Sequence, residues 1–231
     1  MSLTRWALPA VALAGLLVGA GAVHLSRAPG DGAGVRAYLL AHPEVIPEAM
    51  QRLQDRESGK LVSSNRDAIV RPYRGAWAGN ADADVTVVEY FDYNCGYCRA
   101  AIPALQQLIA GDPKVRVVYR ELPILASTSR AAARASLAAA AAGPDPYRRF
   151  HAALYAAGPV SDATIASAAR AVGVDPARIP PDADAEIDRN LRMATTLGLN
   201  GTPAWVIGDR VLSGAQPLQA LQEAVAAARG Q

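Results

Sequence analysis

The spacing of apolar positions changes several times along the chain, and each change predicts a new element. Residues 84–93 (DVTVVEYFDY) form a run of β-branched and aromatic residues, which predicts a buried strand. Apolar residues at helical spacing follow over 99–110, and a second β-branched run predicts another strand over 115–120. Strand, helix and strand in this order predict a parallel pair of strands joined by a crossover helix.

A helical insertion is expected between these strands and the last part of the chain. Residues of about 128–196 favour helix and are interrupted by Gly-Pro and Pro-Pro pairs. The main domain, 77–231, is therefore predicted to be α/β, with a β-α-β unit, the helical insertion and a β-β-α unit. Its further expected elements are helices over 130–142, 150–156, 162–172, 185–197 and 217–228, and strands over 204–207 and 210–212 joined by a turn at Gly208-Asp209.

A small helical segment, 35–60, precedes the main domain. We expect a short helix over 35–41, a break, and a second helix from Pro47 to about Glu57. Its apolar residues, Tyr38 among them, make a stripe, but a segment of this size cannot form a core alone. It must pack on the main domain or on copies of itself.

The connection to the main domain has two interpretations. The polar stretch 57–67 is typical of a linker, but it also fits an exposed continuation of the preceding helix. Residues 61–76 are assigned to the linker.

The first 22 residues are predicted to be a secretory signal peptide. Arg5 provides a positive start, residues 6–23 carry no charged side chain, and Ala20-Gly21-Ala22 offers small residues for cleavage. The alternative is an uncleaved membrane anchor. Both place the rest of the chain outside the cytoplasm, in a compartment where disulfides can persist.

Charge and cysteine content narrow the possible functions. The net charge of +2, with no run of basic residues, argues against nucleic acid as the partner, since phosphate binding needs a strong basic field. The only cysteines are Cys95 and Cys98. A disulfide closing so short a loop removes little chain entropy, so stabilisation is a poor explanation for the pair.

The position of the pair predicts different tasks for the two sulfurs. Cys95 lies where the strand hands over to the helix, and the positive end of the helix dipole favours a nucleophilic thiolate there. Cys98, one turn on, would attack the Cys95 sulfur in a mixed disulfide and release the substrate. Zinc is a weak alternative, because the histidines His24, His42 and His151 lie far from the pair in sequence. Cu(I), which prefers thiolates, remains a second alternative.

Glu89 is the next candidate for catalysis. It interrupts the apolar strand six residues before Cys95. If it is buried beneath the cysteines, its pKa would be raised and it could exchange a proton with Cys98. The alternative is a partly exposed carboxylate paired with Arg116 or Arg120.

Thr202-Pro203 and Tyr97 are candidates for contacting the substrate. A cis Thr202–Pro203 bond would free the backbone groups of Thr202 to pair with a substrate strand. General frequencies of X–Pro bonds favour a trans bond and an ordinary turn here. Tyr97 lies between the two cysteines.

The motifs FDYNCGYCR at 91–99, YRELPIL at 119–125 and LGLNGTPAWVIGD at 197–209 resemble the DsbA-like branch of the thioredoxin superfamily. The resemblance implies a thioredoxin-like fold with a helical insertion, Cys95 as the exposed nucleophile and Cys98 as the resolving cysteine. It further implies that Glu89 is the buried acid and Pro203 a cis-proline facing the site. The Gly-Tyr pair between the cysteines differs from the Pro-His of the strongly oxidising founder, which argues against strong oxidising power.

The segment 35–57 resembles the leading region of ScsC-like proteins. The resemblance implies a homo-oligomer, often a trimer, with disulfide isomerase or reductase activity and a link to copper tolerance. The expected function is therefore a periplasmic thiol–disulfide oxidoreductase that acts on exported proteins with cysteines, is kept reduced by a membrane redox partner, and needs no metal or organic cofactor. A DsbA-like oxidase and a non-catalytic Cu(I)-binding protein are the alternatives.

Overall fold

The computed structural model describes residues 32–230, and the predicted signal peptide or anchor at 1–22 lies outside them. Within the described residues, no helix combines the length and the hydropathy that are needed to cross a membrane. The chain divides into two compact units at Arg52 and Leu53, which are described separately.

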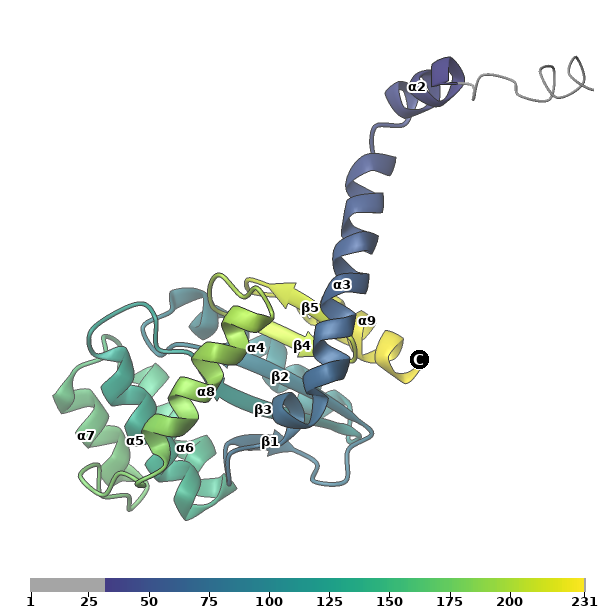
Figure 1. Ribbon diagram of the computed structural model, residues 1–231. Coiled ribbons are helices and arrows are strands. Elements are labelled where there is room, and N and C mark those ends of the chain that lie inside the picture. Colours follow the sequence, from purple (N-terminus) through teal and green to yellow (C-terminus); the bar gives the residue numbers. More distant parts are fainter. Residues whose placement is uncertain (1–31, 231) are drawn as a thin grey trace, which may run out of the picture. The chain divides into compact units, whose positions relative to one another are not determined.

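A five-stranded mixed sheet lies at the centre of the second unit (Figure 1). The strand order is β1-β3-β2-β4-β5, in which β2 and β3 are parallel and all other pairs are antiparallel. The predicted strands and the parallel pair are confirmed. The three-residue strand β1 was not expected, because so short a strand shows no period in the sequence. The strands are β1 (Trp77–Gly79), β2 (Val85–Phe91), β3 (Val115–Glu121), β4 (Ala204–Ile207) and β5 (Arg210–Ser213).

Helices cover both faces of this sheet. Helices α4 (Gly96–Gly111) and α9 (Leu218–Arg229) pack on one face against apolar residues such as Val87 and Val117. Helix α8 (Ala183–Thr196) and the end of α3 pack on the other face, against Val88 and Val118. The predicted insertion is confirmed as four helices between β3 and β4. They are α5 (Ser129–Ala142), α6 (Pro144–Ala156), α7 (Asp162–Ala171) and α8.

Two helices precede the sheet. Helix α2 (Gly32–Ala41) is followed by a break at His42 and by α3 (Val45–Val70), whose first turn contains Pro47, where proline is tolerated. The described residues of the first unit thus comprise α2 and the start of α3.

Helix α3 is longer than predicted, and this corrects the assignment of 61–76 to a linker. The helix continues to Val70, as the second interpretation of the polar stretch allowed. Val62 and Ile69, two helical turns apart, are both buried in the core of the second unit. Their burial explains why the helix continues through a stretch whose other residues are mostly polar.

The buried side chain of Arg120, on β3, holds the end of α3 against the sheet through hydrogen bonds. Its guanidinium donates to the carbonyls of Ala68 (2.6 Å) and Ile69 (3.0 Å), which are unpaired at a helix C-terminus. It also donates to Glu186 of α8 at 2.6 Å, and both side chains of this ion pair are 6% exposed. One buried cation therefore joins α3, β3 and α8.

We predict that Arg120→Met lowers the free energy of unfolding by about 3–5 kcal/mol, because it leaves the Glu186 charge and the α3 carbonyls buried without this partner. Urea unfolding measured by circular dichroism checks the value. Arg148→Gln is the matched control: it breaks the exposed pair with Asp145 and should cost no more than about 1 kcal/mol. Equal losses in the two variants would contradict the role assigned to Arg120.

Candidate active site

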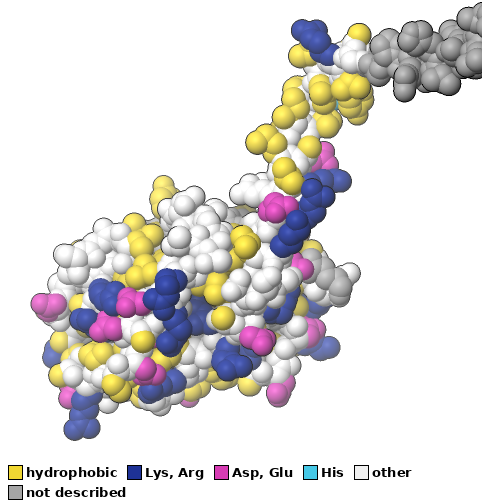
Figure 2. Space-filling model, in the orientation of Figure 1, with side chains coloured by type: hydrophobic (Ala, Val, Ile, Leu, Met, Phe, Trp, Pro, Cys, Tyr) yellow, Lys and Arg dark blue, Asp and Glu magenta, His cyan; other side chains and the backbone are white. Residues whose placement is uncertain are grey.

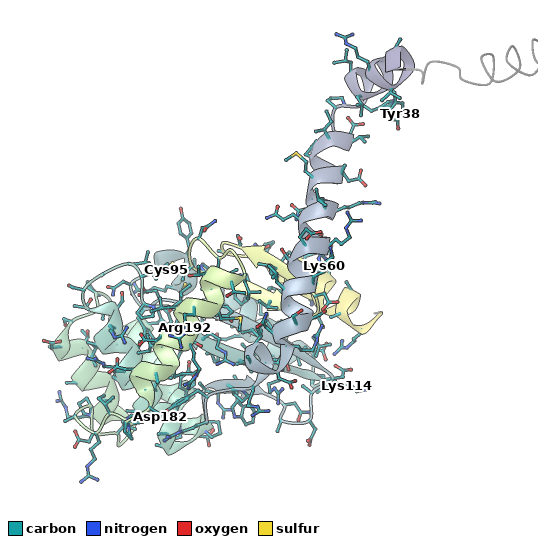
Figure 3. All side chains as sticks on the ribbon, in the orientation of Figure 1. Tyr38, Lys60, Cys95, Lys114, Asp182 and Arg192 are labelled. Carbon is teal, nitrogen blue, oxygen red and sulfur yellow. The ribbon has the colours of Figure 1, made fainter. Side chains whose placement is uncertain are left out.

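The two cysteines lie where the chain turns from β2 into α4 (Figure 3). Cys95 is the N-cap of α4, and its Sγ accepts a hydrogen bond from the backbone N–H of Cys98 at 3.3 Å. Both cysteines are free thiols in this structure. The sequence predicted this position at the helix N-terminus, and the role of Cys95 as the nucleophile stays a prediction.

The two sulfurs differ in accessibility and in protonation. Cys95 is 6% exposed and Cys98 only 1%. Burial, and next the charge of Glu89, raise the pKa of the Cys98 thiol far above its usual range, so Cys98 holds its proton. The order of exposure agrees with the sequence analysis, but Cys95 is less exposed than the resemblance implied because a neighbouring loop covers it.

That loop contains Thr202-Pro203, and the peptide bond between them is cis. The general frequency of X–Pro bonds predicted trans, whereas the family resemblance predicted cis. The Cys95 thiol donates to the Thr202 carbonyl at 3.1 Å. The Oγ1 of Thr202 is buried without a hydrogen-bond partner among residues 32–230. The loop therefore places an unused polar atom beside the nucleophile.

Glu89 is buried in the sheet on the same face as the cysteines. It lies between Tyr119 of β3 and Trp205 of β4, and it is 4% exposed. Burial raises its pKa to about 8. The alternative pairing with Arg116 or Arg120 is excluded, since Arg116 donates to Thr86 and Arg120 pairs with Glu186. A catalytic role for Glu89 stays a prediction.

Asp92 is a central residue of the site that the sequence analysis did not select. Its buried carboxylate accepts hydrogen bonds from the backbone N–H groups of Asn94, Ile124 and Leu125, and from the Ser129 hydroxyl, at 2.8–2.9 Å. It thereby ties the turn before Cys95 to the loop after β3. The bond from Asp92 to the N–H two residues on is typical of Asp in a turn, which is the signal that could have found it.

Exposed apolar side chains surround this turn. Tyr97 is 72% exposed, and Ile124 and Leu125, on the loop that Asp92 holds, are 45% and 51% exposed. Large apolar side chains exposed together are typical of an interaction surface. Their placement agrees with the selection of Tyr97 as a candidate for contacting the substrate, which stays a prediction.

His151 lies in a buried aromatic cluster on the cysteine face. Its Nδ1 is 3.1 Å from the hydroxyl of Tyr93, and its ring contacts Phe91, Tyr119 and Tyr155. Burial lowers the pKa of His151 to about 3, so the imidazole is neutral. Within residues 32–230, no three His, Cys, Asp or Glu side chains gather as a metal site would require. The zinc alternative therefore has no support in the described residues.

Comparison with known proteins gives two family matches. Residues 86–226 match the DSBA-like thioredoxin domain, and residues 32–58 match the N-terminal domain of the copper resistance protein ScsC. Among curated proteins, Na(+)/H(+) antiporter NhaA 1 of Salinispora arenicola is 31% identical over 165 residues, which cover 69% of this chain and 25% of that protein. The chain thus spans about a quarter of the length of the curated relatives it matches.

Solved structures agree with the first match. A linker-deletion mutant of Proteus mirabilis ScsC has a TM-score of 0.70 and 29% identity, covering 86% of this chain and 92% of that one. A thioredoxin-like oxidoreductase from Silicibacter pomeroyi has a TM-score of 0.66 and 40% identity, covering 72% and 99%. Since the family match covers more than half of the residues, the chain belongs to the DSBA-like thioredoxin domain family of thiol–disulfide oxidoreductases.

Proposed function

We propose that this protein is a periplasmic thiol–disulfide oxidoreductase that isomerises or reduces disulfides of exported proteins. The observation that carries the proposal is the Cys95 thiol, held at the N-terminus of α4 against the carbonyl of Thr202 in the cis-proline loop. This arrangement places the Cys95 sulfur beside backbone groups that can pair with a peptide.

The reaction begins with the Cys95 thiolate. It attacks one sulfur of a substrate disulfide, so that a Cys95–substrate bond forms and the other substrate sulfur leaves as a thiolate, which takes a proton from water. In reduction, Cys98 gives its proton to the Glu89 carboxylate and attacks the Cys95 sulfur. The Cys95–Cys98 disulfide forms and the second substrate thiolate leaves. In isomerisation, another substrate thiolate attacks in place of Cys98, and Cys95 is regenerated.

The substrate would bind as an extended segment beside the cis-proline loop. Thr202 offers its backbone N–H, which has no backbone partner among the described residues, and its buried Oγ1. Tyr97, Ile124 and Leu125 would contact apolar side chains of the same segment. Main-chain pairing combined with apolar contact suits unfolded chains of varied sequence.

The N-terminal helices support the isomerase direction through self-association. Tyr38, Leu40 and Met50 are 56%, 65% and 66% exposed, although each is a large apolar side chain. Contact with copies of the same segment would bury them, and residues 32–58 match the N-terminal domain of ScsC. A homo-oligomer, with a trimer as our expectation, would then place several redox pairs around one substrate while a membrane partner keeps them reduced.

The DsbA-like oxidase and the Cu(I)-binding protein remain the alternatives to be tested. The name of the family matched by residues 32–58 motivates the second. Tight Cu(I) binding without reduction of insulin would favour a copper protein. Rapid oxidation of reduced ribonuclease by the disulfide form, without refolding of scrambled ribonuclease, would favour the oxidase.

We predict that Cys95→Ser abolishes insulin reduction, because no other thiol occupies the helix N-terminus. Cys98→Ser should accumulate mixed disulfides with substrates, visible on non-reducing gels, because the resolving attack is lost. Full activity of the Cys95→Ser variant would exclude this mechanism.

We predict that Glu89→Gln slows resolution of the mixed disulfide by about a hundredfold, because the amide cannot take the Cys98 proton. Quenched-flow measurement of the Cys95-bound intermediate checks the rate. An unchanged rate would leave Glu89 with a structural role only.

The same variant tests the raised pKa of Glu89. With a folded pKa of about 8 and an ordinary value of 4.5, the folded state holds a proton that the unfolded state loses between these pH values. The stabilisation is complete below pH 4.5 and is lost as the pH rises to 8. From pH 5.5 to 7.5, wild-type stability should therefore fall relative to Glu89→Gln by about 2–3 kcal/mol in urea unfolding. A constant difference would contradict the raised pKa.

We predict that deletion of residues 32–57 abolishes oligomerisation and lowers the refolding of scrambled ribonuclease about tenfold or more, while insulin reduction persists. The deletion keeps Val62 and Ile69, so the core of the second unit stays complete. Sedimentation velocity and the ribonuclease assay check both effects, with Leu40→Glu/Met50→Glu as a full-length variant. Undiminished refolding by a monomeric variant would overturn the role of the segment.

A further inference from the structure

A cavity in the described part of the chain lies away from the cysteines, on the opposite face of the sheet. Its volume is about 660 Å³, within the range of small-molecule sites. Residues from the end of α3, from β2 and β3, and from α8 line it. Tyr90 of β2 points to this face because it follows Glu89, and side chains alternate along a strand. Neither the cysteines, nor Glu89, nor the cis-proline loop lines this cavity.

Basic residues outnumber acidic ones around the cavity, with five arginines against three carboxylates. Figure 2 shows basic side chains gathered over α8, and Figure 3 marks Arg192 and Asp182 there. Asp182 pairs with Arg74, and Glu186 pairs with both Arg120 and Arg189. These charged side chains are thus joined in two ion-pair groups, and Glu186 is shared between two arginines.

Arg71 and Arg192 have no ion-pair partner among residues 32–230. The third lining carboxylate, Asp67, is exposed and likewise has no recorded ion pair there. Two unpaired guanidinium groups against one carboxylate leave the cavity with excess positive charge. Guanidinium groups bind carboxylate and phosphate through paired N–H donors, so the excess favours an anion.

The inner wall adds two donor groups from largely buried residues, and both line the cavity. Tyr90 is 1% exposed, and its hydroxyl has no hydrogen-bond partner among the described residues. Asn190 is 4% exposed; its Oδ1 accepts from Arg120 at 3.4 Å, whereas its amide N–H groups have no recorded acceptor. Neither group is among the buried polar atoms without a partner in the described residues, so both are open to the cavity. A ligand oxygen entering the cavity would accept hydrogen bonds from both, in addition to those from the arginines.

Most of the remaining lining is apolar. Ala68 lies in the last turn of α3 and Pro72 follows the helix, while the Tyr73 ring and Met193 provide larger apolar surfaces. Such a wall suits a flat apolar group attached to the anionic one.

We propose that this cavity binds a small organic anion, in which Arg71, Arg192, Tyr90 and Asn190 hold a carboxylate or phosphate group and Tyr73 and Met193 contact an apolar ring. The occupant is a small molecule rather than a macromolecule, because the Tyr90 and Asn190 donors are reached only by a group that enters the cavity. The site is separate from Cys95 and does not depend on the proposed redox function.

The test is isothermal titration calorimetry on the full chain with 1-naphthyl phosphate, 1-naphthoate, 1-naphthol and inorganic phosphate as probes. We expect one naphthyl anion to bind at least about tenfold more tightly than neutral naphthol and than phosphate alone. The comparison of the two anions identifies the preferred group. Equal binding of naphthol and both anions, or no binding of either anion at millimolar concentration, would overturn the proposal.

Substitutions of the lining residues test whether the anion binds in this cavity. Arg71→Gln/Arg192→Gln should weaken the preferred anion about tenfold or more, and Tyr90→Phe severalfold. Arg149→Gln/Arg170→Gln is the matched control, since these exposed arginines lie on α6 and α7 and leave the cavity unchanged. The Arg71 carbonyl that accepts from Arg120 is a backbone group, so the substitution keeps that contact. Equal affinities in the cavity double variant and in the control would overturn the site, and urea unfolding confirms that each variant is folded.

Discussion

The turn from β2 into α4 depends on one buried carboxylate. Asp92 accepts hydrogen bonds from three backbone N–H groups and a hydroxyl, and no Lys or Arg is paired with it within residues 32–230. N–H and O–H dipoles alone balance its charge, so each donor must stay in place. The turn that positions Cys95 and the loop that exposes Ile124 and Leu125 are therefore held by the same atoms. The proposed catalytic geometry and the proposed substrate surface therefore depend on the same hydrogen bonds.

Consecutive residues of strand β2 place side chains in two different sites, one on each face of the sheet. Glu89 faces the cysteines, where burial raises its pKa, while Tyr90 faces the basic cavity beside α8. Arg120, on the adjacent β3, fixes the end of α3 on that second face. The redox chemistry and the proposed anion site are thus separated by one layer of the sheet, although consecutive residues contribute to them.

Long elements with a clear period were predictable, and short or context-dependent ones were not. The β-branched runs of β2 and β3 predicted a parallel pair because their apolar pattern is continuous. Strand β1 has three residues and exists through its pairing with β3. Similarly, α3 continues to Val70 because Val62 and Ile69 find a core, which the surrounding polar residues conceal. The aromatic cluster around His151 joins residues from three elements, so no local pattern indicates it.

The sequence by itself determined the candidate chemical groups: a cysteine pair at a strand-to-helix junction, an acid six residues earlier, and a proline before a strand. These depend on residue type and short spacing, which the chain carries locally. Tertiary structure decided between the alternatives that the sequence left open for Glu89 and for the Thr202–Pro203 bond. Glu89 is buried without pairing to Arg120 because Arg120 lies on the opposite face of the sheet, where it pairs with Glu186, and the Thr202 carbonyl contacts Cys95 across 107 positions. Burial and long-range contact set those outcomes, and neither is a property of a local sequence pattern.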